Sequence, residues 1–150
     1  MRDYFAKALM EEAKIDQDLV FITGDLGFGV FERFEELYPN QYFNLGITEQ
    51  AMTGVATGMA LEGKRTITYS IGNFPTLRCL EQIRNDAAYH NVNLTIVAIG
   101  GGFAYGQLGM SHHATEDMAI MKALPNVDVL VPGTDLEAEE ISKIALNRNC

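Results

Sequence analysis

The feature that most constrains the fold is an alternation between short apolar runs and longer helical patterns. Five runs rich in Val, Ile, Leu and Thr are expected to form strands, at residues 19–23, 42–47, 65–71, 94–99 and 127–131. Helical patterns precede or follow them, at residues 3–14, 48–61, 77–89, 115–123 and 136–146. Apolar strands that alternate with helices are typical of a parallel sheet covered on both faces. The sequence therefore predicts one α/β domain, a doubly wound parallel sheet of about five or six strands with helices on both faces.

The composition limits the classes of function. The chain has 150 residues, of which 47% are hydrophobic and 21% charged, as in ordinary globular domains. Its formal net charge is −9, and no cluster of Lys and Arg is present to neutralise phosphates, so no nucleic-acid surface is expected. The longest apolar stretch, around residues 51–61, is far shorter than the ~20 residues of a membrane span. With no visible signal peptide, and with Cys79 and Cys150 as lone thiols, a cytoplasmic protein is the simplest expectation.

The strand-to-helix junction at residues 42–50 places one carboxylate where ligands commonly bind. Thr48 is a good helix N-cap, so Glu49 is expected in the first helical turn, directly after a strand. Open α/β sheets bind ligands at the carboxyl ends of their strands. A glutamate in a first turn can equally be a stabilising acid, because the helix dipole favours negative charge there. The position alone leaves both interpretations open.

Four further candidates follow other predicted strands and are expected at the same edge of the sheet. Asp25 follows the first strand in Gly-Asp-Leu-Gly, although an Asx turn explains it equally well. Tyr69 and Phe74 lie near the end of the third strand, and core packing is the alternative for both rings. His112 follows a glycine-rich loop at residues 100–109 and suits proton transfer near pH 7.

Two other kinds of site are less favoured near that loop. It lacks the Lys-Ser/Thr of a P-loop, so we expect a mobile loop at the rim of an active site, and phosphate binding is the minor alternative. His112 and His113 are adjacent, and adjacent histidines rarely point to one centre. His113 and Asp117, spaced i and i+4, would supply only two ligands, so no metal site is expected.

The helix after Glu49 contains Gly54 and Gly58, each of which costs a helix roughly 0.8–1 kcal/mol relative to alanine. Close approach of another backbone would offset that cost. The approach could be tight packing inside the domain or a helix–helix contact across a dimer interface, and the spacing does not separate the two.

Several segments resemble the transketolase family of thiamine diphosphate enzymes. Residues 46–50, Gly-Ile-Thr-Glu-Gln, resemble its Gly-Ile-x-Glu-Gln motif. The stretch from Tyr69 through Phe74 and the helix after it resemble the segment whose aromatic residues stack on the cofactor's pyrimidine ring. Residues 106–113 are similar to the family's Gly-Glu-Asp-Gly-Pro-Thr-His-Gln. The resemblance implies that residues 1–150 are a pyrimidine-binding domain, truncated before a further C-terminal domain.

The resemblance also implies roles for named residues. Glu49 would contact a ring nitrogen of the cofactor's aminopyrimidine, and Phe74 would stack on that ring, with Tyr69 as the second candidate. His112 would face the sugar and the cofactor's reactive carbon, and Asp25 would lie close to the cofactor. Leu108 stands where transketolases carry an aspartate that contacts substrate hydroxyls, so the substrate and the retention of catalysis stay open.

The implied function is half of an enzyme. The family holds the diphosphate through Mg²⁺ with Gly-Asp-Gly and a later Asn, and this sequence contains no Gly-Asp-Gly. A partner domain or subunit is expected to supply that site in a dimer or other homo- or hetero-oligomer. The expected activity is transfer of a two-carbon ketol unit between sugars, absent without the partner. A deoxyxylulose phosphate synthase-like or 2-oxo acid dehydrogenase beta-subunit-like component stays open, as does a non-catalytic interaction domain of the same fold.

Overall fold

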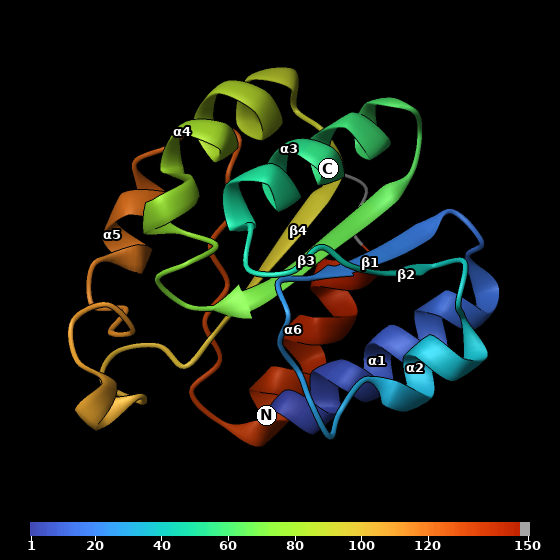
Figure 1. Ribbon diagram of the computed structural model, residues 1–150, viewed down its shortest axis with the longest axis horizontal. Helices are drawn as coiled ribbons and strands as arrows, with labels where there is room; N and C mark the ends of the chain where they lie inside the picture. The colour runs from blue at the N-terminus through green and yellow to red at the C-terminus, as the bar shows by residue number, and fades with distance from the viewer. Residues whose placement is uncertain (148–150) are drawn as a thin grey trace.

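A four-stranded parallel sheet lies at the centre of the computed structural model, which describes residues 1–147 (Figure 1). The strand order is β2-β1-β3-β4. The strands are β1 (Leu19–Thr23), β2 (Tyr42–Asn44), β3 (Arg65–Ile71) and β4 (Leu94–Ile99). All three strand pairings of this sheet are parallel, so the carboxyl ends of the strands meet at one edge. The predicted doubly wound α/β architecture is confirmed.

Helices cover both faces of the sheet (Figure 1). One face carries α1 (Arg2–Ile15), α2 (Glu32–Leu37) and α6 (Asp135–Asn147). The other carries α3 (Glu49–Leu61) and a continuous helical segment made of η1 (Leu77–Cys79), α4 (Leu80–Gln82) and the π-helical η2 (Ile83–Ala88). The loop after β4 contains the short η3 (Gly106–Leu108), and α5 (Asp117–Lys122) follows it. None of the helices in the described part of the chain combines the length and hydropathy needed to cross a bilayer.

Successive residues of the central strands alternate between two cores. On the α1 side, Phe21 and Tyr69 join Phe5 in a cluster of aromatic rings, with the Phe5 and Tyr69 rings stacked at 5.9 Å. On the α3 side, Ile22 packs with Met52 in a smaller cluster. This alternation decides which strand residues can reach the start of α3 and which are confined to the aromatic core.

The sheet has four strands, which corrects the predicted five or six. Residues 127–131 form no strand in the structure. Val127 and Val129 instead pack against the cluster that contains Ile83 and Met121, while Val131 is 57% exposed. Val127 and Val129 thus pack inward as strand residues would, but the run has no backbone pairing with β4 and is therefore not a strand.

Element boundaries also differ from the prediction at the edge of the sheet. The predicted buried strand at residues 42–47 is shorter and lies at the edge, where Phe43 is 40% exposed. Helix α2 was not predicted, because its six residues are too few to show a helical period. Cys79 is a buried free thiol, and Cys150 lies outside the described residues.

Candidate functional site

Glu49 is buried at the start of α3, at the carboxyl edge of the sheet. After β2 the chain turns at Gly46, whose φ of +69° favours glycine. Thr48 is the N-cap residue as predicted, but its hydroxyl donates to the carbonyl of Leu45 at 2.7 Å and does not cap the helix. The helix therefore begins at Glu49, which is only 2% exposed. A carboxylate this deeply buried needs partners.

Both carboxylate oxygens of Glu49 have a hydrogen-bond donor. The hydroxyl of Ser70, near the end of β3, donates to Oε1 at 3.1 Å. Nη1 of Arg78, in η1, donates to Oε2 at 3.2 Å. The first turn of α3 adds the favourable end of the helix dipole. Three separate elements thus converge on one buried carboxylate.

The guanidinium of Arg78 also lies over the ring of Phe74. Its Cζ is 4.3 Å from the ring centroid, within the range of a cation–π contact. The rings of Phe74 and His112 then meet edge to face, with centroids 5.0 Å apart. One chain of contacts therefore runs from Glu49 through Arg78 and Phe74 to His112. The structure brings together three residues that the sequence singled out separately.

His112 is held in the loop after β4 by its neighbours. The hydroxyl of Ser111 lies 3.0 Å from Nδ1 of His112, and the ring of Tyr105 lies 5.8 Å from the imidazole. The loop is fastened to the end of β3, because Nδ2 of Asn73 donates to the carbonyl of Ser111 at 3.0 Å. These contacts hold the imidazole of His112, a side chain that can serve as a general acid or base, at the edge of the sheet.

Asp25 lies at the same edge but on the surface, with a φ of +55°. Asn44 pairs with it twice, since Oδ1 of Asn44 accepts from the Asp25 backbone N–H at 3.0 Å and Nδ2 donates to the Asp25 carboxylate at 3.1 Å. Oδ1 of Asn44 also accepts from the backbone N–H of Gly46 at 2.9 Å. Asn44, which the sequence analysis missed, therefore fastens the loops after β1 and β2 to each other just before Glu49.

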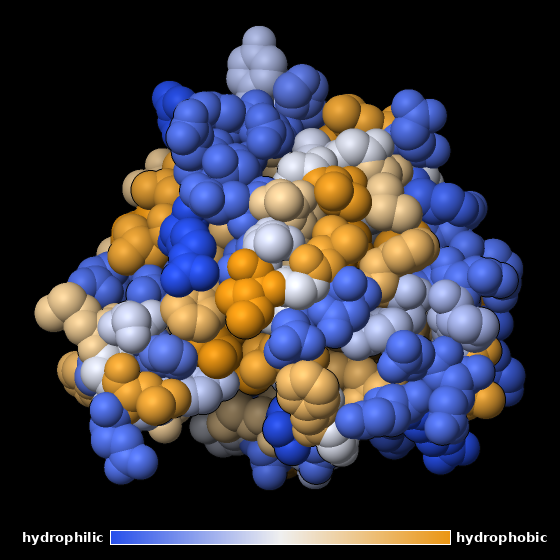
Figure 2. Space-filling view, viewed as in Figure 1, coloured by the Kyte–Doolittle hydropathy of each residue, from blue (hydrophilic) through white to orange (hydrophobic). Residues whose placement is uncertain are grey.

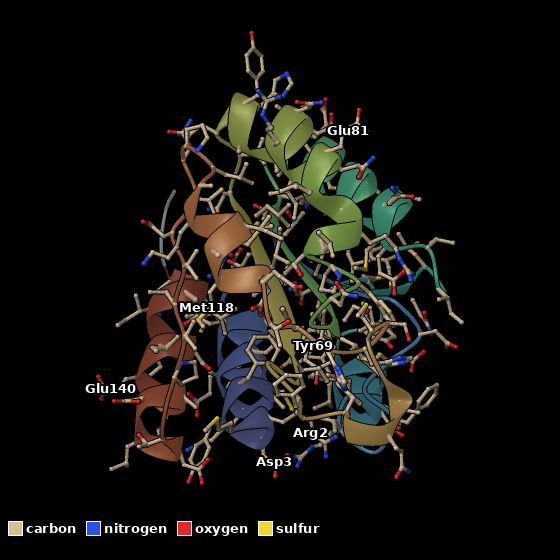
Figure 3. The ribbon with its side chains drawn as sticks, turned by 90° about the vertical axis from the view of Figure 1, so that its left-hand side faces the viewer. Arg2, Asp3, Tyr69, Glu81, Met118 and Glu140 are labelled. Atoms are coloured by element: carbon tan, nitrogen blue, oxygen red, sulfur yellow. The ribbon has the colours of Figure 1, made fainter. Side chains whose placement is uncertain are left out.

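Tyr69 does not lie with this group. Its side chain points to the opposite face of β3 from that of Ser70, which contacts Glu49, and packs with Phe5, Phe21 and Phe31. Tyr69 lies in the interior of the molecule (Figure 3). The residue is fully buried, and its hydroxyl has no hydrogen-bond partner among residues 1–147. Burial raises the pKa of Tyr69 to about 12. Its place is that of a core aromatic, the alternative that the sequence left open.

The glycine-rich segment after β4 forms an irregular loop at the site edge. Leu108, in η3, is 53% exposed. His113 does not converge with His112, since its Nε2 contacts the carbonyl of Gly106 at 2.8 Å and its ring meets that of Phe103. Within the described residues, no three side chains of His, Cys, Asp or Glu are grouped so as to hold a metal ion.

A hollow of about 400 Å³ opens at the start of α3, lined by Ile47, Thr48, Glu49, Gln50, Ala51 and Arg78. A larger hollow, of about 480 Å³, lies at the opposite edge of the sheet. Its charged groups are already engaged in ion pairs, with Arg65 paired to Glu12 and Asp16 and Lys64 paired to Asp18. The chemically unusual group, the buried carboxylate of Glu49 with its ion pair to Arg78, lies at the smaller hollow, and Arg78 links it to the ring of Phe74.

Arg78 is the site residue that sequence reasoning did not assign. It is the single cation in the segment from residue 69 to residue 80, and it follows Phe74 at a spacing of four residues. In the structure Phe74 lies in the turn before η1, and that turn brings Arg78 back over the ring of Phe74. A lone arginine at that distance from a candidate stacking ring was therefore the available signal.

Comparisons with known proteins place the chain in a family. The model of the transketolase pyrimidine-binding domain matches residues 1–150. A subunit of the apulose-4-phosphate transketolase of Phocaeicola vulgatus is 32% identical over 147 residues, which is 97% of this chain and 47% of the relative. A putative transketolase C-terminal section of Methanocaldococcus jannaschii is 39% identical over 133 residues, 88% of this chain and 42% of the relative. The chain thus spans about half the length of these curated relatives.

Solved structures agree. A split gene transketolase, described as an inactive beta4 tetramer, superposes with a TM-score of 0.84 at 34% identity, covering 98% of this chain and 47% of that one. A transketolase from Campylobacter jejuni superposes with a TM-score of 0.85 at 21% identity, covering 98% of this chain and 24% of that one, and this likeness supports the fold. Because the family model matches the whole chain and both sequence and fold agree with transketolase relatives, the chain belongs to the transketolase pyrimidine-binding domain family.

Proposed function

We propose that this chain is the pyrimidine half of a thiamine diphosphate-dependent transketolase-like transferase, which moves a two-carbon ketol unit between sugars. The observation that carries the proposal is the chain of contacts from the buried carboxylate of Glu49 to the imidazole of His112 at the carboxyl edge of the sheet. Relatives named for apulose-4-phosphate and for 6-deoxy-6-sulfo-D-fructose support a sugar substrate.

The residues at this edge fit an aminopyrimidine ring. Such a ring is flat and carries nitrogen atoms in its plane. The guanidinium of Arg78 is also flat with in-plane nitrogens, and it binds Glu49 at 3.2 Å while lying 4.3 Å from the ring centroid of Phe74. One carboxylate and one aromatic face are therefore arranged to hold a planar, nitrogen-bearing group.

Each residue has a separate task in the proposed site. Glu49 holds a ring nitrogen at a buried position where water competes little, and Phe74 packs on the flat face of the ring. His112, oriented by Ser111, faces the substrate and holds or transfers a proton. Asp25 lies at the rim, where its pair with Asn44 keeps the loops in place. When bound, thiamine diphosphate supplies the nucleophilic carbon that amino-acid side chains lack.

We propose that the remaining half of the site comes from a second chain or domain. That partner would hold the diphosphate through Mg²⁺, which prefers carboxylate and amide oxygens. The relatives named as a transketolase subunit and as a C-terminal section support a split enzyme, and the split transketolase described as inactive supports a chain without activity of its own.

The outer face of α3 is the surface that we propose for this partner. A Cβ added at Gly54 or Gly58 would have no described atom of the chain within 4 Å beyond the helix's own backbone, so tight packing inside the domain does not explain these glycines. Val55 and Leu61 on the same helix are 44% and 56% exposed, and Figure 2 shows apolar side chains across the middle of this face. An exposed apolar face with two helix glycines suits close approach of another helix.

The test is turnover in the assembled protein. The chain is mixed with its candidate diphosphate-domain partner, thiamine diphosphate and Mg²⁺, and ketol transfer from a ketose phosphate to an aldose phosphate is followed. We expect activity only in the mixture, and loss of at least about a hundredfold in Glu49→Gln. Glu81→Gln makes the same chemical change at an exposed position at the molecule's periphery (Figure 3) and should leave activity unchanged. Equal turnover by the wild type and Glu49→Gln would refute the proposed role of Glu49.

A further inference from the structure

We propose that Arg78 is an internal ligand of the site. In the free domain its guanidinium occupies the place of the cofactor's aminopyrimidine, and it has to leave before the cofactor binds. The inference rests on the proposed function, because it takes Glu49 and Phe74 as the two sides of the ring's place.

The first support is that one planar group makes two chemically different contacts. The guanidinium donates a hydrogen bond to Oε2 of Glu49 at 3.2 Å, and its Cζ lies 4.3 Å from the centroid of Phe74. A hydrogen bond in the plane and an aromatic ring over the face are the two contacts that a bound aminopyrimidine needs. An ion pair alone would not require the second contact.

The second support is the way in which Arg78 covers the carboxylate. The side chain of Glu49 is 1% exposed, whereas that of Arg78 is 45% exposed. Both side chains line the hollow at the start of α3, and the carboxylate's other oxygen is bound by Ser70 on β3. A ligand that enters from the hollow therefore meets the guanidinium before it reaches Glu49.

The backbone of Arg78 is held by two hydrogen bonds, while its side chain is 45% exposed. Nε2 of Gln50 donates to the carbonyl of Arg78 at 3.2 Å, and the N–H of Arg78 donates to the carbonyl of Asn73 at 3.3 Å. The guanidinium itself is at the surface, so it can rotate into water without moving η1. Rotation of the Arg78 side chain alone would therefore make the carboxylate of Glu49 accessible from the hollow.

The physical benefit is protection of a buried charge. Without a cationic neighbour, the carboxylate of Glu49 would stay buried with one hydroxyl donor, which is unfavourable. Arg78 supplies a hydrogen bond and a positive charge to the carboxylate of Glu49 until the cofactor binds. Because it occupies the same place, it also competes with the cofactor for Glu49. The apparent dissociation constant is then the intrinsic constant divided by the fraction of molecules in which Arg78 has left.

The main experiment measures cofactor affinity in the assembled protein. Thiamine diphosphate with Mg²⁺ is titrated calorimetrically into the complex of the full-length protein and its diphosphate-domain partner. We expect Arg78→Ala to bind at least about tenfold more tightly than wild type, and Arg78→Lys, which keeps the charge but lacks the flat group, to fall between them. Arg84→Ala removes another exposed cation from the same helical segment, one bonded to Asn85, and should bind as wild type does.

A second experiment, without the cofactor, tests whether a free planar cation can bind where the guanidinium of Arg78 lies. Thermal unfolding of the same complex is followed with a few millimolar ethylguanidinium, and with ethylammonium as the control salt. Ethylguanidinium should raise the unfolding temperature of Arg78→Ala, since it refills the vacated place, and should not raise that of wild type or of Arg78→Ala combined with Glu49→Gln.

The outcomes separate the inference from the proposed function. Weaker or unchanged cofactor affinity in Arg78→Ala, with clear binding by wild type, overturns the internal-ligand role and leaves the function standing. Absence of cofactor binding in wild type and in Arg84→Ala overturns the proposed function, and with it the competition. In that case, stabilisation of Arg78→Ala by ethylguanidinium would still identify a binding site for a planar cation beside Glu49. If ethylguanidinium does not stabilise Arg78→Ala, that binding site is refuted as well.

Discussion

Replacement of Tyr69 by Phe should stabilise the protein, although it deletes a polar group from the core. The hydroxyl of Tyr69 is fully buried and has no hydrogen-bond partner among residues 1–147. A buried, unpaired polar group costs about 1–3 kcal/mol, while the ring packing with Phe5 and Phe31 is kept in the variant. We expect Tyr69→Phe to raise the free energy of unfolding by about 1 kcal/mol at pH 7.

The difference in unfolding free energy between Tyr69→Phe and the wild type should increase in alkaline solution. Burial raises the pKa of Tyr69 from 10.0 to about 12. An acid whose folded pKa is raised contributes stability that is present below the unfolded pKa and is lost as pH rises toward the folded one. At pH 10.5 the wild type should therefore lose about 0.8 kcal/mol relative to the variant, widening the difference to about 1.8 kcal/mol.

Urea unfolding of both proteins at pH 7 and pH 10.5 measures these differences. Tyr89→Phe is the matched control, because Tyr89 is 79% exposed and its change should stay below about 0.5 kcal/mol. A destabilised Tyr69→Phe at pH 7, or a difference that does not increase with pH, would refute the reasoning and would mean that the hydroxyl has a partner.

Three further changes have expected outcomes. Gly58→Ala should stabilise the isolated chain by about 0.8–1 kcal/mol, since nothing lies within 4 Å of the added methyl, and should weaken association with the partner; urea unfolding and sedimentation check these. Arg65→Met should cost about 3 kcal/mol of unfolding free energy, because Glu12, at 13% side-chain exposure, loses its cation. Phe74→Leu should weaken thiamine diphosphate binding by the assembled protein about fivefold by calorimetry, because the flat ring face is lost.

The parts of the site that could be predicted are those that depend on strand polarity. Parallel strands bring their carboxyl ends to one edge, so Glu49, Phe74 and His112, each placed after a different strand, had to lie near one another. The sequence did not separate Tyr69 from Ser70, because β3 is buried on both faces and shows no polar–apolar alternation. Ser70 contacts Glu49, whereas its neighbour Tyr69 lies in the aromatic core on the other face of the sheet.

The unpredicted features depend on which surfaces meet after folding. Val127 and Val129 carry the apolar character of a strand, but packing under a helix and pairing with a strand produce the same residue types. Arg78 was given no role from the sequence, and its ion pair with Glu49 spans 29 residues. No local pattern contains that contact.

Calorimetric titration of thiamine diphosphate with Mg²⁺ tests the central claim most directly. It is run on the chain alone, on the chain mixed with its diphosphate-domain partner, and on the mixture that carries Glu49→Ala. The account predicts binding in the wild-type mixture, none in the chain alone, and a marked loss in the Glu49→Ala mixture. A well-folded, stably associated wild-type mixture that binds no cofactor would contradict it and leave an interaction domain of the transketolase fold.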